Sequence, residues 1–102
     1  MKKRTFTKRD IVKRVAKQTS SSYELSAPFV DEVFTTIREM MSEDYDNVRI
    51  EVRNFGVLEV KPTKAKPRAR NPRTNEEVYV PAHKKSHFKP GKLLKQRLKQ
   101  PI

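Results

Sequence analysis

The stretch from Lys61 to Thr74 constrains the fold most, because it cannot join a hydrophobic core. It contains three prolines and six Lys or Arg residues, and it has no large apolar side chain. Residues 78–80 then read as a short strand that ends at Pro81. A two-stranded ribbon without an apolar face is marginal in water, and proline lacks a ladder donor. The sequence predicts a protruding hairpin at about residues 61–81, poorly ordered when free. A disordered basic linker is the alternative that composition leaves open.

The remaining chain offers only a thin core. Of 102 residues, 34% are hydrophobic and 35% are charged, which suits one small domain that is marginal alone. We expect a second copy to complete the core. Cysteine is absent, so disulfides and thiolate metal sites are excluded. No apolar run is long enough to span a membrane, and no apolar segment follows the basic start, so no signal peptide is expected.

Charge is distributed unevenly. Residues 1–60 have a balance of +1 and residues 61–102 a balance of +11, within a net charge of +12. A nearly neutral half joined to a strongly basic half is typical of a scaffold that carries a polyanion-binding surface. This pattern favours nucleic acid as the partner, with an anionic membrane as the weaker competitor.

Two helices are predicted in the first half. Thr7 and Asp10 form a candidate capping box, and Phe6 and Ile11 flank it as a hydrophobic staple. A polar loop at residues 18–22 ends this first helix. For the second helix, Ser26 is the predicted cap, Leu25 and Val30 the staple, and Pro28 a first-turn residue. The apolar stripes, which we assign to the core, are Ile11, Val12, Val15 and Ala16, and then Val30, Val33, Phe34, Ile37, Met40 and Met41.

Strand signals follow a turn at residues 44–47. Residues 48–53 alternate apolar and charged side chains, residues 53–56 form a tight turn, and residues 57–60 begin the returning strand. Residues 83–88 are expected to return as a further strand. Pro90 and Gly91 then open a last short helix on which Leu94 and Leu98 share a face.

No enzymatic arrangement is recognisable. His83 and His87 would share one face of a strand, but lysines lie between them and no carboxylate is adjacent, so a metal site is disfavoured. Glu76 and Glu77 point to opposite strand faces, which does not suit acid–base catalysis. With only two glycines there is no glycine-rich phosphate loop. We therefore expect neither catalysis nor a cofactor or metal.

The run from Arg68 to Asn75 is the strongest functional signal. An extended basic ribbon fits the minor groove, where arginine favours the negative potential of narrow A·T-rich stretches. Pro72 lies near the tip, and a rigid ring without an N–H can enter between base pairs and unstack them. A plain turn proline is the alternative that this one sequence leaves open.

Three motifs together resemble the family of HU and integration host factor, which are known minor-groove benders. They are Asn54-Phe55-Gly56, Arg70-Asn71-Pro72-Arg73-Thr74 and the run from Phe88 to Lys95, and the resemblance covers nearly the whole chain. It implies an α+β fold and an intertwined homodimer, with two N-terminal helices, a three-stranded antiparallel sheet with long β-arms, and a short C-terminal helix. The corresponding parts of one single domain, residues 1–102, are a helical dimerisation part (1–47), the sheet with its arm (48–89, arm about 61–81) and the last helix (90–102).

The resemblance also implies function. The protein would bind duplex DNA in the minor groove with little sequence specificity, bend it and compact the nucleoid in the cytoplasm, as a homodimer or as a heterodimer with a paralogue. A small basic RNA-binding structural protein is the main alternative, and a nuclease the third. The resemblance assigns DNA intercalation to Pro72, minor-groove contacts to Arg68, Arg70, Asn71 and Arg73, phosphate contacts to Arg53, Lys64, Lys66, Lys84, Lys85 and Lys92, and the dimer core to Phe34, Phe55, Leu58 and Phe88.

The sequence departs from that family at the turns and in the arm. Asn54 and Asn75 occupy positions where glycine is usual, and asparagine tolerates the left-handed backbone that such turns need. Pro62 and Pro67 are unusual in the arm. The stretch from residue 58 to residue 72 is one residue longer than in common members, a difference that a β-bulge would absorb.

Overall fold

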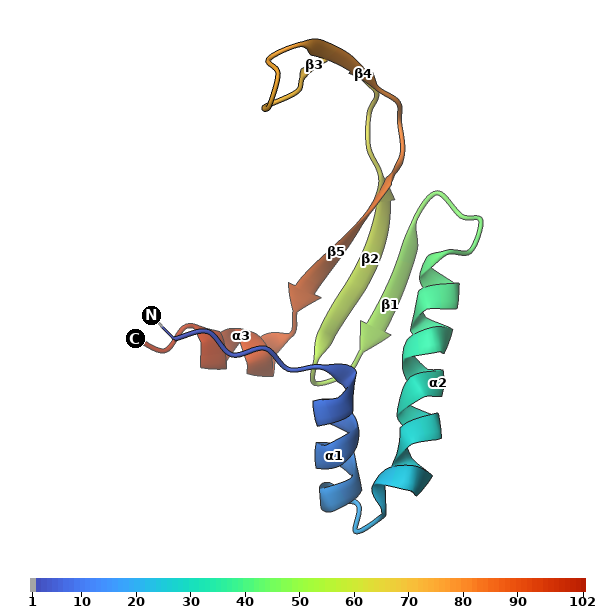
Figure 1. Cartoon of the computed structure of the whole chain (residues 1–102), viewed down its shortest axis with the longest axis vertical. Coiled ribbons are helices and arrows are strands. Elements are labelled where there is room, and N and C mark those ends of the chain that lie inside the picture. Colours follow the sequence, from blue (N-terminus) through green and yellow to red (C-terminus); the bar gives the residue numbers. More distant parts are fainter. Residues whose placement is uncertain (1) are drawn as a thin grey trace. The chain divides into compact units, whose positions relative to one another are not determined.

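The computed structural model describes residues 2–102, which form two compact units, residues 2–40 and 41–102 (Figure 1). The first unit contains helix α1 and most of helix α2. The second contains five strands and a short helix, and the α+β class with antiparallel sheets is confirmed. The elements are α1 (Lys8–Gln18), α2 (Tyr23–Met41), β1 (Val48–Val52), β2 (Gly56–Pro62), β3 (Lys66–Arg70), β4 (Glu77–Val80), β5 (Lys84–Pro90) and α3 (Lys92–Leu98).

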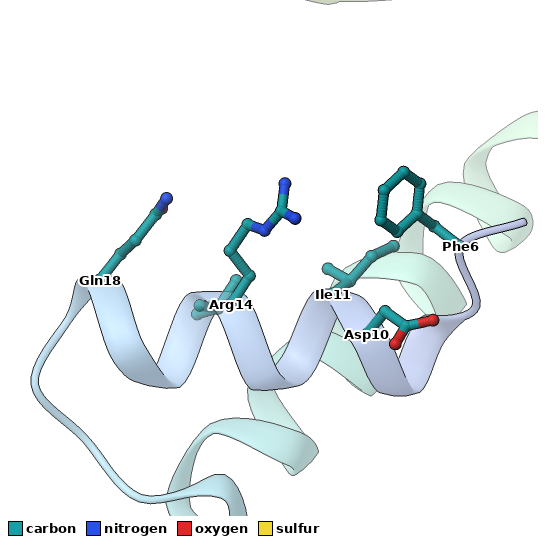
Figure 2. A pocket seen from close by; sticks show the side chains of 6 residues that line it. Phe6, Asp10, Ile11, Arg14 and Gln18 are labelled. Atoms are coloured by element: carbon teal, nitrogen blue, oxygen red, sulfur yellow. The ribbon is translucent and has the colours of Figure 1, made fainter. Parts of the chain in front are cut away.

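Helix α1 begins as its sequence predicts. The Thr7 backbone N–H donates to Asp10 Oδ2 at 2.9 Å, and the Thr7 hydroxyl donates to the same oxygen at 3.1 Å. These two bonds stabilise the ionised carboxylate, so the pKa of Asp10 is lowered. Of the predicted core stripe, Val12 and Ala16 are buried and Val15 is half-buried, whereas Ile11 is exposed beside Phe6 (Figure 2), so the assignment of Ile11 to the core is wrong for the single chain. The helix ends where the Thr19 hydroxyl donates to the Val15 carbonyl at 2.7 Å.

Helix α2 begins earlier than its sequence suggested, and the prediction of a Ser26 cap is wrong. The Leu25 N–H donates to Ser22 Oγ at 3.1 Å, so Ser22 caps the helix and Ser26 is buried inside it. Pro28 therefore lies in the helix interior instead of its first turn. Its missing N–H affects the carbonyl of Glu24, an exposed residue that water can reach, so the helix tolerates it.

The three-stranded sheet has the order β1-β2-β5, with both pairs antiparallel. The turn between β1 and β2 places Asn54 at φ +65°, the left-handed conformation expected there. Gly56 follows because no side chain fits: a Cβ would lie 2.5 Å from the Lys89 carbonyl oxygen and 2.7 Å from the Phe88 ring. The Gly91 N–H donates to the Phe55 carbonyl at 2.8 Å and so ties the start of α3 to this turn.

Strands β3 and β4 form a separate two-stranded hairpin, hereafter the arm, at residues 66–80. The predicted hairpin is thus present where a linker was the alternative. Lys66 pairs with Val80 and Ala69 with Val78, so β3 advances three residues while β4 advances two. This register shift is a bulge that places one more residue in β3 than in β4. Within residues 2–102, no helix has the length and apolar character to cross a membrane.

Candidate nucleic-acid interface

A closed turn shapes the tip of the arm. The Asn71 N–H donates to the Glu76 carbonyl at 2.9 Å, and the Asn75 N–H donates to the Asn71 carbonyl at 2.7 Å. The Asn71 side chain accepts the Arg73 N–H at 2.9 Å, and Asn75 has φ +59°, as its place in the turn requires. These bonds satisfy the backbone around Pro72 and leave its ring exposed.

Arg70 holds the two sides of the tip together. Its Nη1 donates to the Asn75 carbonyl at 3.1 Å, and its Nη2 lies 3.9 Å from Glu77 Oε1. The guanidinium is still largely exposed, so it remains accessible to a ligand. Exposed cations also follow the strands and connections of the arm: Lys64, Lys66, Arg68 and Arg73.

A polar clasp joins the two connections at the base of the arm. The Thr63 N–H donates to the His83 carbonyl at 2.7 Å, and the His83 N–H donates to Thr63 Oγ1 at 3.3 Å. The Thr63 hydroxyl also donates to the His83 carbonyl at 3.1 Å. The clasp lies between Pro62, which ends β2, and Pro81, which follows β4. Three bonds therefore fasten the arm at the point where the ladder is interrupted.

The same clasp corrects the prediction that the two histidines share a strand face. His83 precedes β5, and its Nδ1 lies 2.9 Å from the Pro81 carbonyl oxygen and 3.2 Å from Thr63 Oγ1. His87 lies within β5, opposite Glu59. Within the described residues, no three His, Cys, Asp or Glu side chains come together as a metal site.

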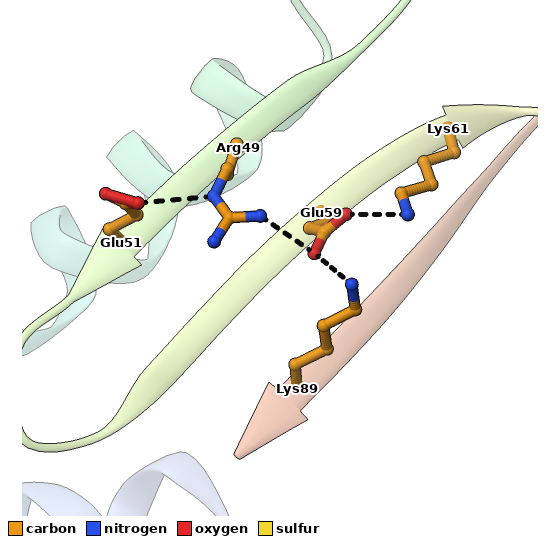
Figure 3. Close-up of polar contacts among 5 residues, drawn as sticks. All are labelled: Arg49, Glu51, Glu59, Lys61 and Lys89. Atoms are coloured by element: carbon orange, nitrogen blue, oxygen red, sulfur yellow. Dashed lines mark hydrogen bonds and ion pairs between the residues drawn. The ribbon is translucent and has the colours of Figure 1, made fainter. Parts of the chain in front are cut away.

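One face of the three-stranded sheet is charged and centres on Glu59. This carboxylate is only 3% exposed because the side chains of neighbouring strands cover it. Lys89 Nζ lies at 3.0 Å, Lys61 Nζ at 3.1 Å and Arg49 Nη1 at 3.4 Å from its oxygens (Figure 3). Hydrogen bonds from Lys89 and then Lys61 lower the pKa of Glu59 to about 2. The carboxylate stays ionised and holds these ammonium groups in place.

The remaining predicted phosphate contacts are dispersed. Lys85 lies opposite Lys61 and so belongs to the charged face, whereas Lys84, one residue away, points to the other face. Arg53 lies in the turn between β1 and β2, and Lys92 begins α3. All four side chains are exposed.

The predicted dimer-core residues of the sheet lie on its apolar face or in the turn beside it. Phe55 and Phe88 are in ring contact, with centroids 5.0 Å apart, and Leu58 pairs with Phe88 across the strands. Phe55 is nevertheless 47% exposed and Phe88 37% exposed. The fourth predicted residue, Phe34, lies on α2 in the other unit and is also exposed.

Two features of the site were not anticipated from sequence. The Glu59 cluster depends on the strand register, which places Arg49 directly opposite Glu59. The clasp of Thr63 and His83 joins residues 20 positions apart and has no local signature.

Comparison with known proteins identifies the family. A family model described as bacterial DNA-binding protein matches residues 6–99. The SPbeta prophage-derived DNA-binding protein HU 2 of Bacillus subtilis is 36% identical over 94 residues, which cover 92% of this chain and 98% of the relative. DNA-binding protein HU-1 of Halalkalibacterium halodurans is 38% identical over 90 residues, which cover 88% of this chain and 96% of that protein. An Anabaena HU–DNA cocrystal structure matches with a TM-score of 0.80 and 28% identity, covering 94% of this chain and 100% of the other. The chain belongs to the HU family of bacterial DNA-binding proteins.

Proposed function

We propose that this protein is an architectural protein that binds duplex DNA in the minor groove and bends it, without catalysis. The observation that carries the proposal is the arm tip, where an exposed Pro72 lies between cationic strands and needs no hydrogen-bond partner. A proline ring that enters a base step costs a few kcal/mol of unstacking, and a bent duplex that contacts more protein offsets this cost. The relatives are named as DNA-binding proteins, and an Anabaena HU was crystallised with DNA.

Arm cations are proposed to provide most of the affinity. Arg68, Arg70, Asn71 and Arg73 would follow the minor groove, while Arg53, Lys64, Lys66, Lys84, Lys85 and Lys92 would neutralise phosphates. Binding of this kind has little base readout and falls steeply with salt. RNA is the less favoured partner, because readers of single-stranded RNA stack bases on aromatic side chains. Phe55, in the turn between β1 and β2, and Phe88, on β5, are instead in contact with each other.

The proposed assembly is a homodimer. Among the described residues, the buried apolar side chains are only Val12, Ala16, Val30 and Val60. Helix α2 meanwhile exposes a continuous apolar stripe, with Phe29 at 76%, and shallow apolar grooves run along it. A second copy would cover this stripe and the exposed rings of Phe34, Phe55 and Phe88. Sedimentation at low micromolar concentration should give twice the mass of one 12.0 kDa chain, and a folded monomer would refute the proposal.

The variant Pro72→Ala tests the proposed insertion of Pro72 between base pairs. End-to-end energy transfer on a labelled duplex should report a smaller bend, with affinity reduced much less. Pro67→Ala is the matched control, because Pro67 lies in the bulge of the same arm and not at its tip. An unchanged bend in Pro72→Ala would reduce Pro72 to an ordinary turn residue. A protein of this function would act on the nucleoid in the cytoplasm, and fluorescence imaging of the tagged protein checks that location.

A further inference from the structure

The side chain of His83 has two ring nitrogens, and the clasp at the base of the arm uses one of them. Nδ1 lies 2.9 Å from the Pro81 carbonyl oxygen and 3.2 Å from Thr63 Oγ1. A carbonyl oxygen has no proton to give, so the 2.9 Å contact requires a proton on Nδ1. This hydrogen bond orients the ring, and Nδ1 remains a donor whether the ring is neutral or charged.

The second ring nitrogen, Nε2, is left for another partner. His83 is exposed, and among the described residues no recorded hydrogen bond or ion pair involves its Nε2. In a neutral ring with its proton on Nδ1, Nε2 has a lone pair and only accepts hydrogen bonds. A phosphate oxygen also accepts, so the neutral ring cannot bind phosphate through Nε2. The charged ring can bind it, because its Nε2–H is a donor.

His83 lies among residues that are proposed to bind phosphates. Lys64 belongs to the facing connection at the base of the arm, and Lys84 directly follows His83 at the start of β5. Both lysine side chains are exposed. Farther along the same ladder, Lys61 pairs with Lys85, which adds two more cations. Phosphates that contact these lysines would therefore lie close to the His83 ring.

The surroundings of His83 contain cations but no anion that is paired with it. Within residues 2–102, no recorded ion pair includes His83. The nearest carboxylate along the ladder is that of Glu59, which lies opposite His87 and is already neutralised by three cations of the sheet. Residues 81 and 82, which lead from β4 to His83, are uncharged. A bound duplex would bring anions to this ring, and nearby anions favour its protonated form.

We infer that His83 is a proton-linked phosphate contact. When duplex DNA binds, Nε2 takes up a proton from solvent and donates it in a hydrogen bond to a backbone phosphate, while Nδ1 keeps its bond to the Pro81 carbonyl. This role rests on the proposed DNA binding and adds a dependence on pH, because histidine ordinarily changes its charge between about pH 5 and pH 8. Linkage requires that the proton and the DNA strengthen each other's binding by the same factor.

The affinity of the full-length protein for a labelled duplex, measured at two pH values and fixed salt, tests this role. At about 0.1 M salt one phosphate contact is worth roughly tenfold, so the parent should bind at least about tenfold more tightly at about pH 5.5 than at about pH 8. In His83→Asn the amide N–H can replace the Nδ1 donor to Pro81, but nothing replaces Nε2. This variant should match the parent within about twofold at the higher pH and lose most of the gain at the lower pH.

Two control variants and a second measurement make the result specific. His87→Asn removes the other histidine of the chain, which is also exposed, and should keep the parent's pH dependence. His83→Arg supplies a permanent cation, so at about pH 8 it should bind about as tightly as the parent does at about pH 5.5. Calorimetry in two buffers of different ionisation enthalpy counts the protons taken up on binding. The parent should take up protons at about pH 6.5, and His83→Asn should take up fewer.

Each contrary result has a definite meaning. A parent affinity that is the same at both pH values would overturn the role of His83, and so would an unchanged pH dependence in His83→Asn. Loss of the pH dependence in His87→Asn would assign the proton to His87 instead. Equal weakening of His83→Asn at both pH values would show that the ring acts without a proton, through the clasp alone or as an acceptor. Failure of the parent to bind the duplex at either pH would instead refute the proposed function.

Discussion

The three-stranded sheet and the arm are both antiparallel ladders, yet their side chains serve different ends. In the sheet, β2 pairs with β5 over seven consecutive positions, and Glu59 and Val60 are buried at its centre. The arm has a bulge within its shorter ladder, and most of its side chains are exposed. The sheet directs its side chains toward one another, whereas the arm leaves them available to a partner. Stability and binding are thereby separated along one continuous chain.

The pairing of cations shows the same difference. Lys61, Lys89 and Arg49 converge on one buried carboxylate in the sheet. In the described arm, the one recorded ion pair is the 3.9 Å approach of Arg70 and Glu77. A cation already paired with a carboxylate gains less from a phosphate than an unpaired one does, because it must give up its first partner. We therefore expect arm cations to contribute more to DNA affinity than the sheet cations do.

The largest expected effect is on DNA affinity and comes from the arm. Lys66→Gln, Arg68→Gln and Arg73→Gln together remove three exposed cations without touching the Arg70 contacts that shape the tip. At about 0.1 M salt each lost phosphate contact costs roughly tenfold, and the proposed homodimer loses three cations from each of its two arms, so affinity should fall by at least about 10³-fold and the salt dependence should become shallower. The free energy of unfolding should change by less than about 0.5 kcal/mol. Fluorescence anisotropy across a salt series measures the DNA affinity, and urea titration measures the free energy of unfolding. Comparable losses in affinity and in stability would contradict the idea that the arm serves binding and the sheet serves stability.

The largest effect on the free energy of unfolding is expected from a substitution in the three-stranded sheet. Gly56→Ala places a Cβ 2.5 Å from the Lys89 carbonyl oxygen, which is backbone and cannot move aside cheaply. Overpacking of this kind costs about 1–3 kcal/mol of unfolding free energy. Gly91→Ala is the matched control, since its Cβ would meet its nearest atom, the Phe55 carbonyl oxygen, at 3.1 Å. Urea denaturation should rank Gly56→Ala as clearly the less stable, and equal stability of the two would show that the sheet adjusts easily.

Features set by a few neighbouring residues were predictable from sequence. The Thr7–Asp10 cap, the left-handed Asn54 and Asn75 and the tip position of Pro72 all follow from local chemistry, and the structure places them as expected. The α2 cap was mistaken because Ser22 and Ser26 both qualify, and only burial distinguishes them. The Glu59 cluster was missed for a different reason. Its burial arises from three strands in register, which no local pattern specifies.

A smaller effect is expected from the charge at the centre of the sheet. The pKa of Glu59 is lowered from 4.5 to about 2, so its ionised form stabilises the fold above about pH 4.5, and that contribution is lost as pH falls toward about 2. Glu59→Gln should lower stability at neutral pH and flatten the pH dependence within this window. Glu51→Gln is the control, because its side chain is 68% exposed and its one recorded ion pair within residues 2–102 is with Arg49, at 3.2 Å. Free energies of unfolding measured from pH 6 to pH 2 should separate the two variants. If the stability of Glu59→Gln changes with pH as that of the parent does, Glu59 is not the cause of the pH dependence.

The smallest effect is expected at the junction of the two regions. Thr63→Val keeps the shape of the side chain and the backbone bond from the Thr63 N–H to His83, but it removes both hydroxyl bonds, in which Thr63 Oγ1 accepts from the His83 N–H and donates to the His83 carbonyl. The loss should be about 0.5–1.5 kcal/mol and local, because both bonds lie at an exposed site where water replaces the hydroxyl. Hydrogen exchange should therefore accelerate at the His83 amide while the amides of β1, β2 and β5 keep their protection. Thr74→Val is the control, since its hydroxyl lies at the tip and, among the described residues, accepts one hydrogen bond, from the Glu76 N–H at 3.4 Å. Faster exchange throughout the three-stranded sheet in Thr63→Val would mean that the arm and the sheet unfold as one cooperative unit. The two ladders would then differ only in how exposed their side chains are.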